Sequence, residues 1–144
     1  MKLYTSEILS KVAAADTETK KINILRENYS PALEDILLWA YDKERVQFFT
    51  NTVPPYTPDQ SPEGLSFTNM YSEHKRFYIF LKETRVDVAR KNIILTQMLE
   101  ALGESESKVL EGIILRKIPE VSKELAEKAY PGLFQRPIRI PAEA

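Results

Sequence analysis

The sequence predicts a single all-α domain of about six to eight helices, and three observations support this fold class. Apolar residues recur at spacings of three and four along most of the chain, as they do on one face of an α-helix. Several of these runs begin at a capping residue or end at a proline. The 43% hydrophobic and 28% charged content over 144 residues is ordinary for one compact domain with its own core.

Two short amphipathic helices are expected at the start of the chain. The first is marked by apolar residues at spacing four: Tyr4, Ile8 and Val12. Asp16 or Thr17 can cap the second, because a side-chain oxygen there accepts a hydrogen bond from a free amide of the first turn. The apolar face of this second helix carries Ile22, Leu25 and Tyr29.

A third helix is expected from Ser30, and it is the most clearly marked in the chain. Ser30-Pro31 places a capping hydroxyl before a proline at the first helical position, where a missing amide costs nothing. The apolar residues that follow keep the helical period: Leu33, Ile36, Leu37 and Ala40. The helical pattern is expected to resume or continue through Phe49. Trp39 lies one residue off the stripe, so we expect it to be partly exposed at a contact surface.

Residues 51–66 are expected to form a long surface loop. They include four prolines, each of which removes a backbone donor and restricts the residue before it. The helices before this stretch are too few to close a core, so we interpret it as a loop and not as a domain linker. Residues 1–133 are therefore taken as one helical domain, and residues 134–144 as an extended C-terminal tail.

Four further helices are expected after the loop. Two of them cover about residues 66–83 and 84–102. Ser105 can cap the next one, which Pro119 ends. A last short helix stops before Pro131-Gly132, and its apolar face carries Val121, Leu125 and Ala129.

The composition excludes several classes of function. The chain has no cysteine, which excludes disulfides, thiolate zinc sites and cysteine nucleophiles and suits a reducing cytoplasm. Its 4 glycines provide neither a P-loop nor a dinucleotide fingerprint. No apolar run approaches the roughly 18 residues of a membrane span, and no signal peptide is recognised. We therefore expect no cofactor, no metal and no membrane partner.

Two features that could mark a site have plainer structural interpretations. His74 is the only histidine, and its place on a helix with two tyrosines fits the edge of a core better than a hydrolase, for which no nucleophile signature exists. Phe77, Tyr78 and Phe80 could stack nucleobases, as in single-strand binders. Aromatic rings embedded among aliphatic residues in a helix are, however, more often part of the core.

Basic residues gather near helix ends and turns, where side chains and free amides can clamp phosphates. The candidates for DNA contact follow the third helix or surround the break at residue 119: Arg116, Lys123, Lys128, Lys43 and Arg45. The alternative for Arg116 is charge compensation at a helix C-terminus, worth about 0.3–1 kcal/mol. The formal net charge is −1, so DNA binding requires that the charges segregate onto different faces.

The order of many positions from Ile8 to Leu133 resembles a known DNA-binding domain. The matching positions are Ile8-Leu9, Ala13, Lys21, Ile24-Leu25, Leu33, Ala40-Tyr41, Gln47-Phe48-Phe49, the proline loop, Leu65 to Met70, Arg116 and Ala126 to Leu133. They resemble the N-terminal all-helical domain of T-even-type bacteriophage ATP-dependent DNA ligases. In that family the domain wraps the duplex through backbone contacts, and the arginine matched by Arg116 belongs to a helix-loop region that approaches DNA phosphates.

The resemblance implies a tailed-phage protein that acts in the host cytoplasm and binds double-stranded DNA weakly and without sequence preference. The adenylated Lys-x-Asp-Gly motif of the ligases is absent, and the sequence stops about where their catalytic domain begins. We therefore expect no enzyme but an accessory protein of DNA replication or repair, which binds DNA or a DNA-processing complex.

The alternative function is a protein-interaction module for a phage or host partner that has lost DNA binding. Two departures from the ligase pattern favour this alternative. Pro119-Glu120-Val121 adds a carboxylate after Arg116, and Thr50-Asn51-Thr52 replaces the lysines expected before the proline loop. Both changes remove positive charge from the expected DNA face.

Overall fold

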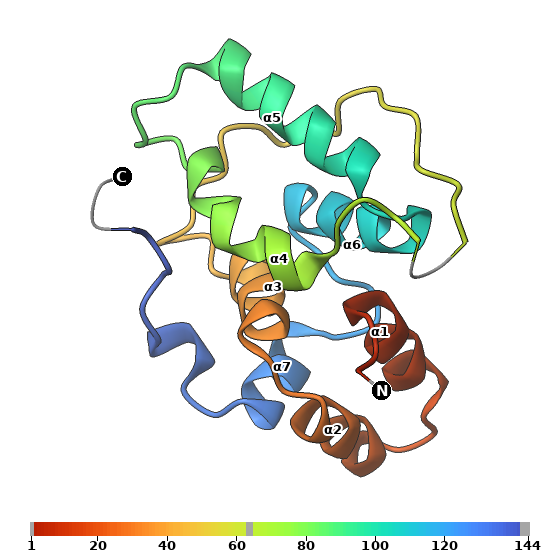
Figure 1. Cartoon of the computed structure of the whole chain (residues 1–144). Coiled ribbons are helices and arrows are strands. Elements are labelled where there is room, and N and C mark those ends of the chain that lie inside the picture. Colours follow the sequence, from red (N-terminus) through yellow and green to blue (C-terminus); the bar gives the residue numbers. More distant parts are fainter. Residues whose placement is uncertain (1, 63–64, 142–144) are drawn as a thin grey trace.

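The structure is a computed structural model that describes residues 2–62 and 65–141. Within these ranges the chain forms seven α-helices, two 3-10 helices and no strand, which confirms the predicted all-α class (Figure 1). The α-helices are α1 (Thr5–Ala14), α2 (Glu18–Glu27), α3 (Pro31–Tyr41), α4 (Met70–Glu73), α5 (Val88–Ala101), α6 (Glu104–Ile114) and α7 (Lys123–Ala129). The 3-10 helices are η1 (His74–Phe80), which continues α4, and η2 (Leu133–Gln135).

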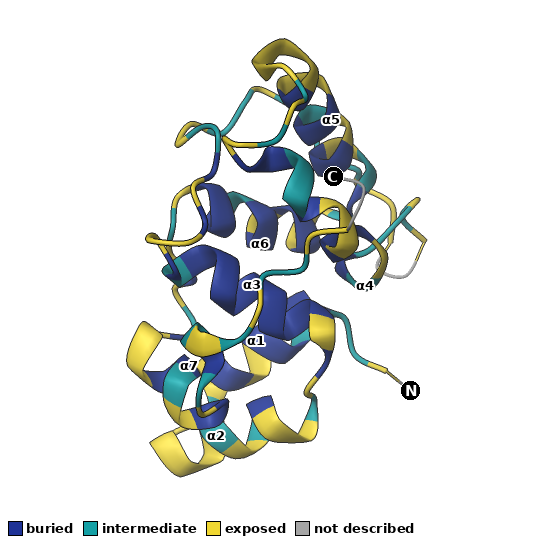
Figure 2. Ribbon diagram, turned by 90° about the vertical axis from the view of Figure 1, so that its left-hand side faces the viewer, coloured by how far each residue is buried: buried dark blue, intermediate teal, exposed yellow. Residues whose placement is uncertain are grey.

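Helix α3 lies at the centre of the fold and is buried almost all the way round. Every residue from Ala32 to Ala40 is buried, including Glu34 and Asp35 (Figure 2). The helix packs against α4, α6, α7, η1 and η2. Helices α2 and α7 pack together at one end of the molecule, whereas α5 lies at the other end and packs against α6 (Figure 1).

The expectation that Trp39 is partly exposed is wrong. Its side chain is 1% exposed and packs edge-on against Phe77, with ring centroids 5.6 Å apart. Phe77 and Phe80 are also buried. This aromatic group therefore belongs to the core, as the structural interpretation predicts. The error has a physical reason, because a stripe of apolar residues predicts exposure correctly only for a helix with one buried face.

The capping signals predicted two helix starts and failed at a third. Thr17 caps α2 by accepting a hydrogen bond from the amide of Lys20 at 3.2 Å. Ser30 caps α3 by accepting one from the amide of Leu33 at 3.1 Å. Ser105, in contrast, lies inside α6, whose N-cap is Gly103.

Four expected helical stretches are shorter in the structure. Helix α3 ends at Tyr41, and the chain then turns away instead of staying helical through residue 49. Only Met70–Glu73 and His74–Phe80 are helical within residues 66–83, and α5 begins at Val88, after the cap Asp87. Tyr29 likewise lies beyond the end of α2 and is 48% exposed. Periodicity alone therefore overestimated helix length where tertiary contacts fix the backbone.

The described part of the proline loop is irregular, as predicted, but its two ends are anchored. The hydroxyl of Tyr56 hydrogen-bonds to Glu111 on α6, and burial, together with this carboxylate, raises the pKa of Tyr56 to about 12. At the other end, Thr68 pairs with Leu102 through an isolated β-bridge. Residues 63 and 64 of the predicted loop lie outside the described residues.

The predicted C-terminal tail begins with the turn η2 and then runs without regular structure to residue 141. It lies against α3, where Arg136 bonds to Glu34, and Arg139 bonds to Asp35. Asp35 also bonds to His74, with 2.6 Å between Oδ2 and Nδ1. The tail thus neutralises carboxylates that α3 buries; residues 142–144 of the prediction lie outside the described residues.

No helix in the described ranges is both long enough and apolar enough to span a membrane. The longest of these helices, α5, has 14 residues and carries Arg90 and Lys91 in its first turn.

We expect Leu37→Ala to lower the free energy of unfolding by about 2–5 kcal/mol, because it leaves a cavity in an enclosed site. The Leu37 side chain is 0% exposed, whereas Leu115 is 57% exposed. Leu115→Ala is therefore the matched control, with an expected change below about 0.5 kcal/mol. Urea denaturation followed by circular dichroism measures both values. A loss below about 1 kcal/mol for Leu37→Ala would contradict the central position of α3.

Candidate nucleic-acid interface

Three cations from distant parts of the chain line one pocket of about 570 Å³, which we call the Arg116 pocket. Lys43 follows α3, Lys82 follows η1, and Arg116 follows α6. The other lining residues are uncharged: Val46, Gln47, Phe48, Phe49, Thr50, Asn51 and Ile114. No carboxylate belongs to the described residues of this lining. A concave surface of one charge sign concentrates the electrostatic potential, so it attracts an anionic group.

Arg116 is positioned by the way in which α6 ends. The amide of Lys117 donates to the carbonyl of Gly112 at 2.8 Å, and the amide of Arg116 donates to Ile113 at 3.1 Å. These two bonds form a Schellman motif, whose closing residue adopts the left-handed conformation. Arg116 has φ 63° and is the one non-glycine residue with positive φ in the described chain. Glycine usually fills such a position, and another residue costs about 1–2 kcal/mol there.

The side chain of Arg116 connects the end of α6 to the turn after α3. Its Nη2 atom donates to the carbonyls of Asp42 at 3.1 Å and Val46 at 2.8 Å. Its Nη1 atom is buried and has no hydrogen-bond partner among the described residues. Burial lowers the pKa of Arg116, and the Asp42 carboxylate opposes this shift. Arg116 is thus a structural clamp, and its buried Nη1 atom has no partner among the described residues.

Lys82 reaches the pocket because two backbone segments pair. The amide of Phe49 donates to the carbonyl of Phe80 at 2.8 Å, and the amide of Lys82 donates to Gln47 at 2.9 Å. This pairing brings the segment after η1 beside the turn that carries Lys43. Both lysines are exposed, and neither forms an ion pair with a described carboxylate. Sequence reasoning missed Lys82, because only the long-range pairing marks it.

Lys91 supports this wall from inside the protein. Its side chain is 2% exposed, and its ammonium donates to the carbonyl of Leu81 at 2.5 Å. It also lies 3.4 Å from the carbonyl of Thr84 and 6.0 Å from the ring centroid of Phe49. Burial lowers the pKa of Lys91. A buried lysine therefore fixes the turn that presents Lys82.

Three of the predicted DNA contacts lie away from the Arg116 pocket. The Arg45 guanidinium binds the Asp42 carboxylate at 2.7 Å and also donates to two carbonyls of the C-terminal segment. The Lys123 ammonium lies 5.2 Å from the ring centroid of Phe134. Lys128 pairs with Glu18 on α2 at 2.8 Å. The structure thus brings Arg116 and Lys43 together and gives the other three cations partners within the protein.

The buried pair of His74 and Asp35 fits the structural interpretation of this histidine. His74 is 5% exposed, and its partner Asp35 also accepts a hydrogen bond from Arg139. The described residues include no group of three or more histidine, aspartate or glutamate side chains that could hold a metal ion.

Residues 8–120 match a family model described as a family of unknown function, DUF6433. The chain belongs to this family. A search of curated proteins found no match. The matched range of this DUF6433 protein contains Lys43, Lys82 and Arg116, whereas α7, which carries Lys123 and Lys128, lies beyond it. The Arg116 pocket is therefore built entirely within the region that defines the family.

The two roles of Arg116 can be separated by two substitutions. Arg116→Ala and Arg116→Gly both remove the bonds to Asp42 and Val46, but only glycine also relieves the left-handed backbone strain. We expect Arg116→Gly to have a free energy of unfolding about 1 kcal/mol higher than that of Arg116→Ala. Urea denaturation of both variants measures the difference. Equal stabilities would show that the strain is absent.

Lys91→Met should lower the free energy of unfolding by about 1–3 kcal/mol, because it removes the charged donor to the carbonyl of Leu81, which then keeps only its bonds from Thr84. Methionine retains the apolar stem of lysine, so little packing is lost. The neighbouring Arg90 is exposed, and Arg90→Met is the matched control. Thermal and urea denaturation provide the comparison. If both variants are as stable as the original protein, Lys91 does not support the wall of the pocket.

Proposed function

We propose that this protein binds the phosphate backbone of double-stranded DNA through the Arg116 pocket and catalyses no reaction. The observation that carries the proposal is the grouping of Lys43, Lys82 and Arg116 around a pocket whose described lining has no carboxylate. Cations beside a phosphate displace its counterions, which gives affinity without sequence preference. The proposed setting is DNA replication or repair in the host cytoplasm of a tailed phage.

The distribution of charge supports this proposal despite the net charge of −1. Five acidic side chains are buried: Glu34, Asp35, Asp42, Glu73 and Glu106. Among the described lysines and arginines, only Lys91 is buried to that degree. Burial therefore removes more acidic than basic side chains from the surface of the described residues. The cations of the Arg116 pocket add to this exposed positive charge.

The resemblance to the helical domain of phage DNA ligases supports a role in DNA binding without catalysis. Arg116 matches an arginine that belongs to a helix-loop region approaching DNA phosphates in that family. The lysine nucleophile that those ligases adenylate belongs to a Lys-x-Asp-Gly motif, which this sequence does not contain. Arg116 and the missing motif therefore support DNA binding without the ligation of DNA strands.

A second candidate function is a protein-interaction module that has lost DNA binding. One observation favours it: Leu65 and Phe67 are 71% and 91% exposed, although large apolar side chains are usually covered. Isolated exposed apolar residues are normal on a protein surface, so this observation is weaker than the grouping of cations.

We expect Lys43→Gln and Lys82→Gln each to weaken duplex binding. Each should also make the slope of log affinity against log salt concentration less steep by about one unit. The change should be similar for unrelated duplex sequences, because phosphate contacts do not read the bases. Fluorescence anisotropy of labelled duplexes, titrated at several salt concentrations, measures both quantities.

Lys128→Gln is the control for this experiment, because Lys128 is exposed but lies outside the pocket and pairs with Glu18. It should leave duplex affinity nearly unchanged. If Lys128→Gln loses as much duplex affinity as the pocket variants do, the binding reflects only general attraction between opposite charges. No binding of duplex by the original protein at tens of micromolar would instead favour the protein-interaction module.

A further inference from the structure

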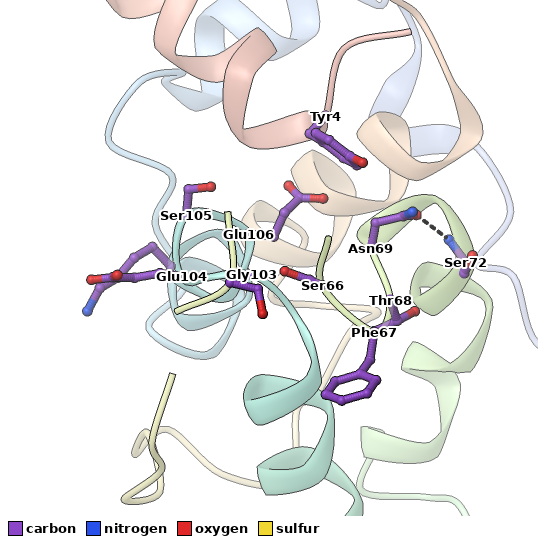
Figure 3. A pocket seen from close by; sticks show the side chains of 12 residues that line it. Tyr4, Ser66, Phe67, Thr68, Asn69, Ser72, Gly103, Glu104, Ser105 and Glu106 are labelled. Carbon is purple, nitrogen blue, oxygen red and sulfur yellow. Dashed lines mark hydrogen bonds between the residues drawn. The ribbon is translucent and has the colours of Figure 1, made fainter. Parts of the chain in front are cut away.

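A second pocket, of about 580 Å³, lies where three distant parts of the chain meet. The start of the chain contributes Tyr4, the end of the proline loop contributes residues 66–69, and the start of α6 contributes residues 103–106 (Figure 3). We call it the Phe67 pocket. It shares no lining residue with the Arg116 pocket. Its volume is within the range of about 300–1,000 Å³ that is typical of small-molecule sites.

Phe67 is an exposed aromatic residue whose two neighbours in the chain contact the rest of the protein. Its side chain is 91% exposed, although the next residue, Thr68, pairs with Leu102. The preceding residue, Ser66, lies so close to Gly103 that a Cβ atom on this glycine would be 2.8 Å from its Oγ. Asn69 then caps α4 by accepting a hydrogen bond from the amide of Ser72 at 3.2 Å. The backbone that carries the ring is therefore held by the contacts of its neighbours, and the ring itself is almost fully exposed.

The wall between the two aromatic residues of the pocket is polar. In Figure 3, Tyr4 and Phe67 lie at opposite ends, with Ser66, Asn69 and Glu106 between them. Glu106 is 4% exposed and lines the pocket. A site that combines an aromatic platform with a polar wall suits a planar ligand whose edge carries hydrogen-bonding groups.

Glu106 has acceptor capacity left for such a ligand. Its Oε2 atom accepts from the hydroxyl of Thr5 at 2.5 Å and from the amide of Ser6 at 2.9 Å. Its Oε1 atom accepts from the amide of Met70 at 3.2 Å. A carboxylate has about four lone-pair sites, so Oε1 can accept one further hydrogen bond. Its negative charge selects a donor such as an amino group.

We propose that the Phe67 pocket binds one unpaired nucleobase, which stacks on Phe67 and donates an amino hydrogen to Glu106. Exposed aromatic side chains stack bases in proteins that bind single strands, and glutamate accepts hydrogen bonds from the amino group of cytosine. This inference rests on the proposed function, because it adds a contact to an unpaired base in a nucleic acid whose duplex part binds at the Arg116 pocket. The phosphates of the strand lie outside the pocket, where they avoid the charges of Glu104 and Glu106.

The polar wall also distinguishes this site from a docking surface for a protein. Anchors of protein interfaces are typically enclosed by apolar contacts that exclude water. Around Phe67 the pocket presents hydroxyl and carboxylate groups instead, including those of Ser66, Ser72 and Glu106. A protein covering this region would have to satisfy each of these groups, whereas the polar edge of a base can bond to them directly.

The test uses Phe67→Trp as a fluorescent reporter of stacking. The native tryptophan, Trp39, is 1% exposed and emits at shorter wavelength than a tryptophan in water, so the emission of the new residue can be followed separately. The protein is titrated with an oligocytidine strand and with an abasic strand of the same length and charge. We expect the oligocytidine strand to quench the exposed tryptophan and the abasic strand to leave its emission unchanged.

Affinity measurements on the unlabelled protein complete the test. Phe67→Ala should weaken the binding of oligocytidine by about five- to a hundred-fold and should leave the binding of the abasic strand unchanged. Leu65→Ala is the matched control, since it removes an exposed side chain without an aromatic ring, and it should have no comparable effect. Oligothymidine carries a carbonyl in place of the cytosine amino group, so we expect it to bind more weakly than oligocytidine.

The possible outcomes separate this inference from the proposed function. Equal affinity for the abasic and oligocytidine strands, or no loss in Phe67→Ala, would overturn the base site and leave duplex binding through Lys43 and Lys82 intact. Quenching by oligocytidine in a protein that does not bind duplexes would support the base site and count against the Arg116 pocket. Loss of a protein partner in Phe67→Ala, with equal affinity for both strands, would refute the base site in favour of protein docking.

Discussion

The enclosure of α3 on every side is the constraint on which the rest of the structure depends. An enclosed helix must find partners for any charge that it carries, because an unpaired buried carboxylate is costly. Glu34 and Asp35 meet this requirement through Arg136 and Arg139. The C-terminal segment is therefore an integral part of the core. Arg45 fixes it further by donating to its carbonyls, which removes this arginine from the set of cations that face outward.

The cations of the protein thus fall into two groups with different consequences. Arg45 and Lys91 satisfy carbonyls of the fold, whereas Lys43 and Lys82 project into solvent beside a pocket. Arg116 also lines this pocket, but its Nη2 atom holds two carbonyls, and its Nη1 atom is buried without a partner among the described residues. A substitution at Arg116 will therefore affect folding and binding together, and the lysines are better probes of binding alone.

The sequence predicted those features that local chemistry determines. Ser30-Pro31 located the start of α3, and the prolines located the long loop. The sequence could not show that α3 is enclosed, so Trp39 was misplaced. It could not show Lys82 as a pocket residue either, because its position depends on pairing between residues 47–49 and 80–82. The surroundings of Phe67 were likewise hidden, since they come from three segments that only the fold brings together.

The docking of the C-terminal segment on α3 has a consequence for how the chain folds during synthesis. Arg136 follows Glu34 by 102 residues, and Arg139 follows Asp35 by 104. A ribosome therefore releases the central helix long before the arginines that neutralise it have been made. Until then, enclosing α3 would bury two carboxylates without their arginine partners. The final packing of the core must therefore wait until the chain has been made through Arg139, and the helices made first cannot reach their final packing before then.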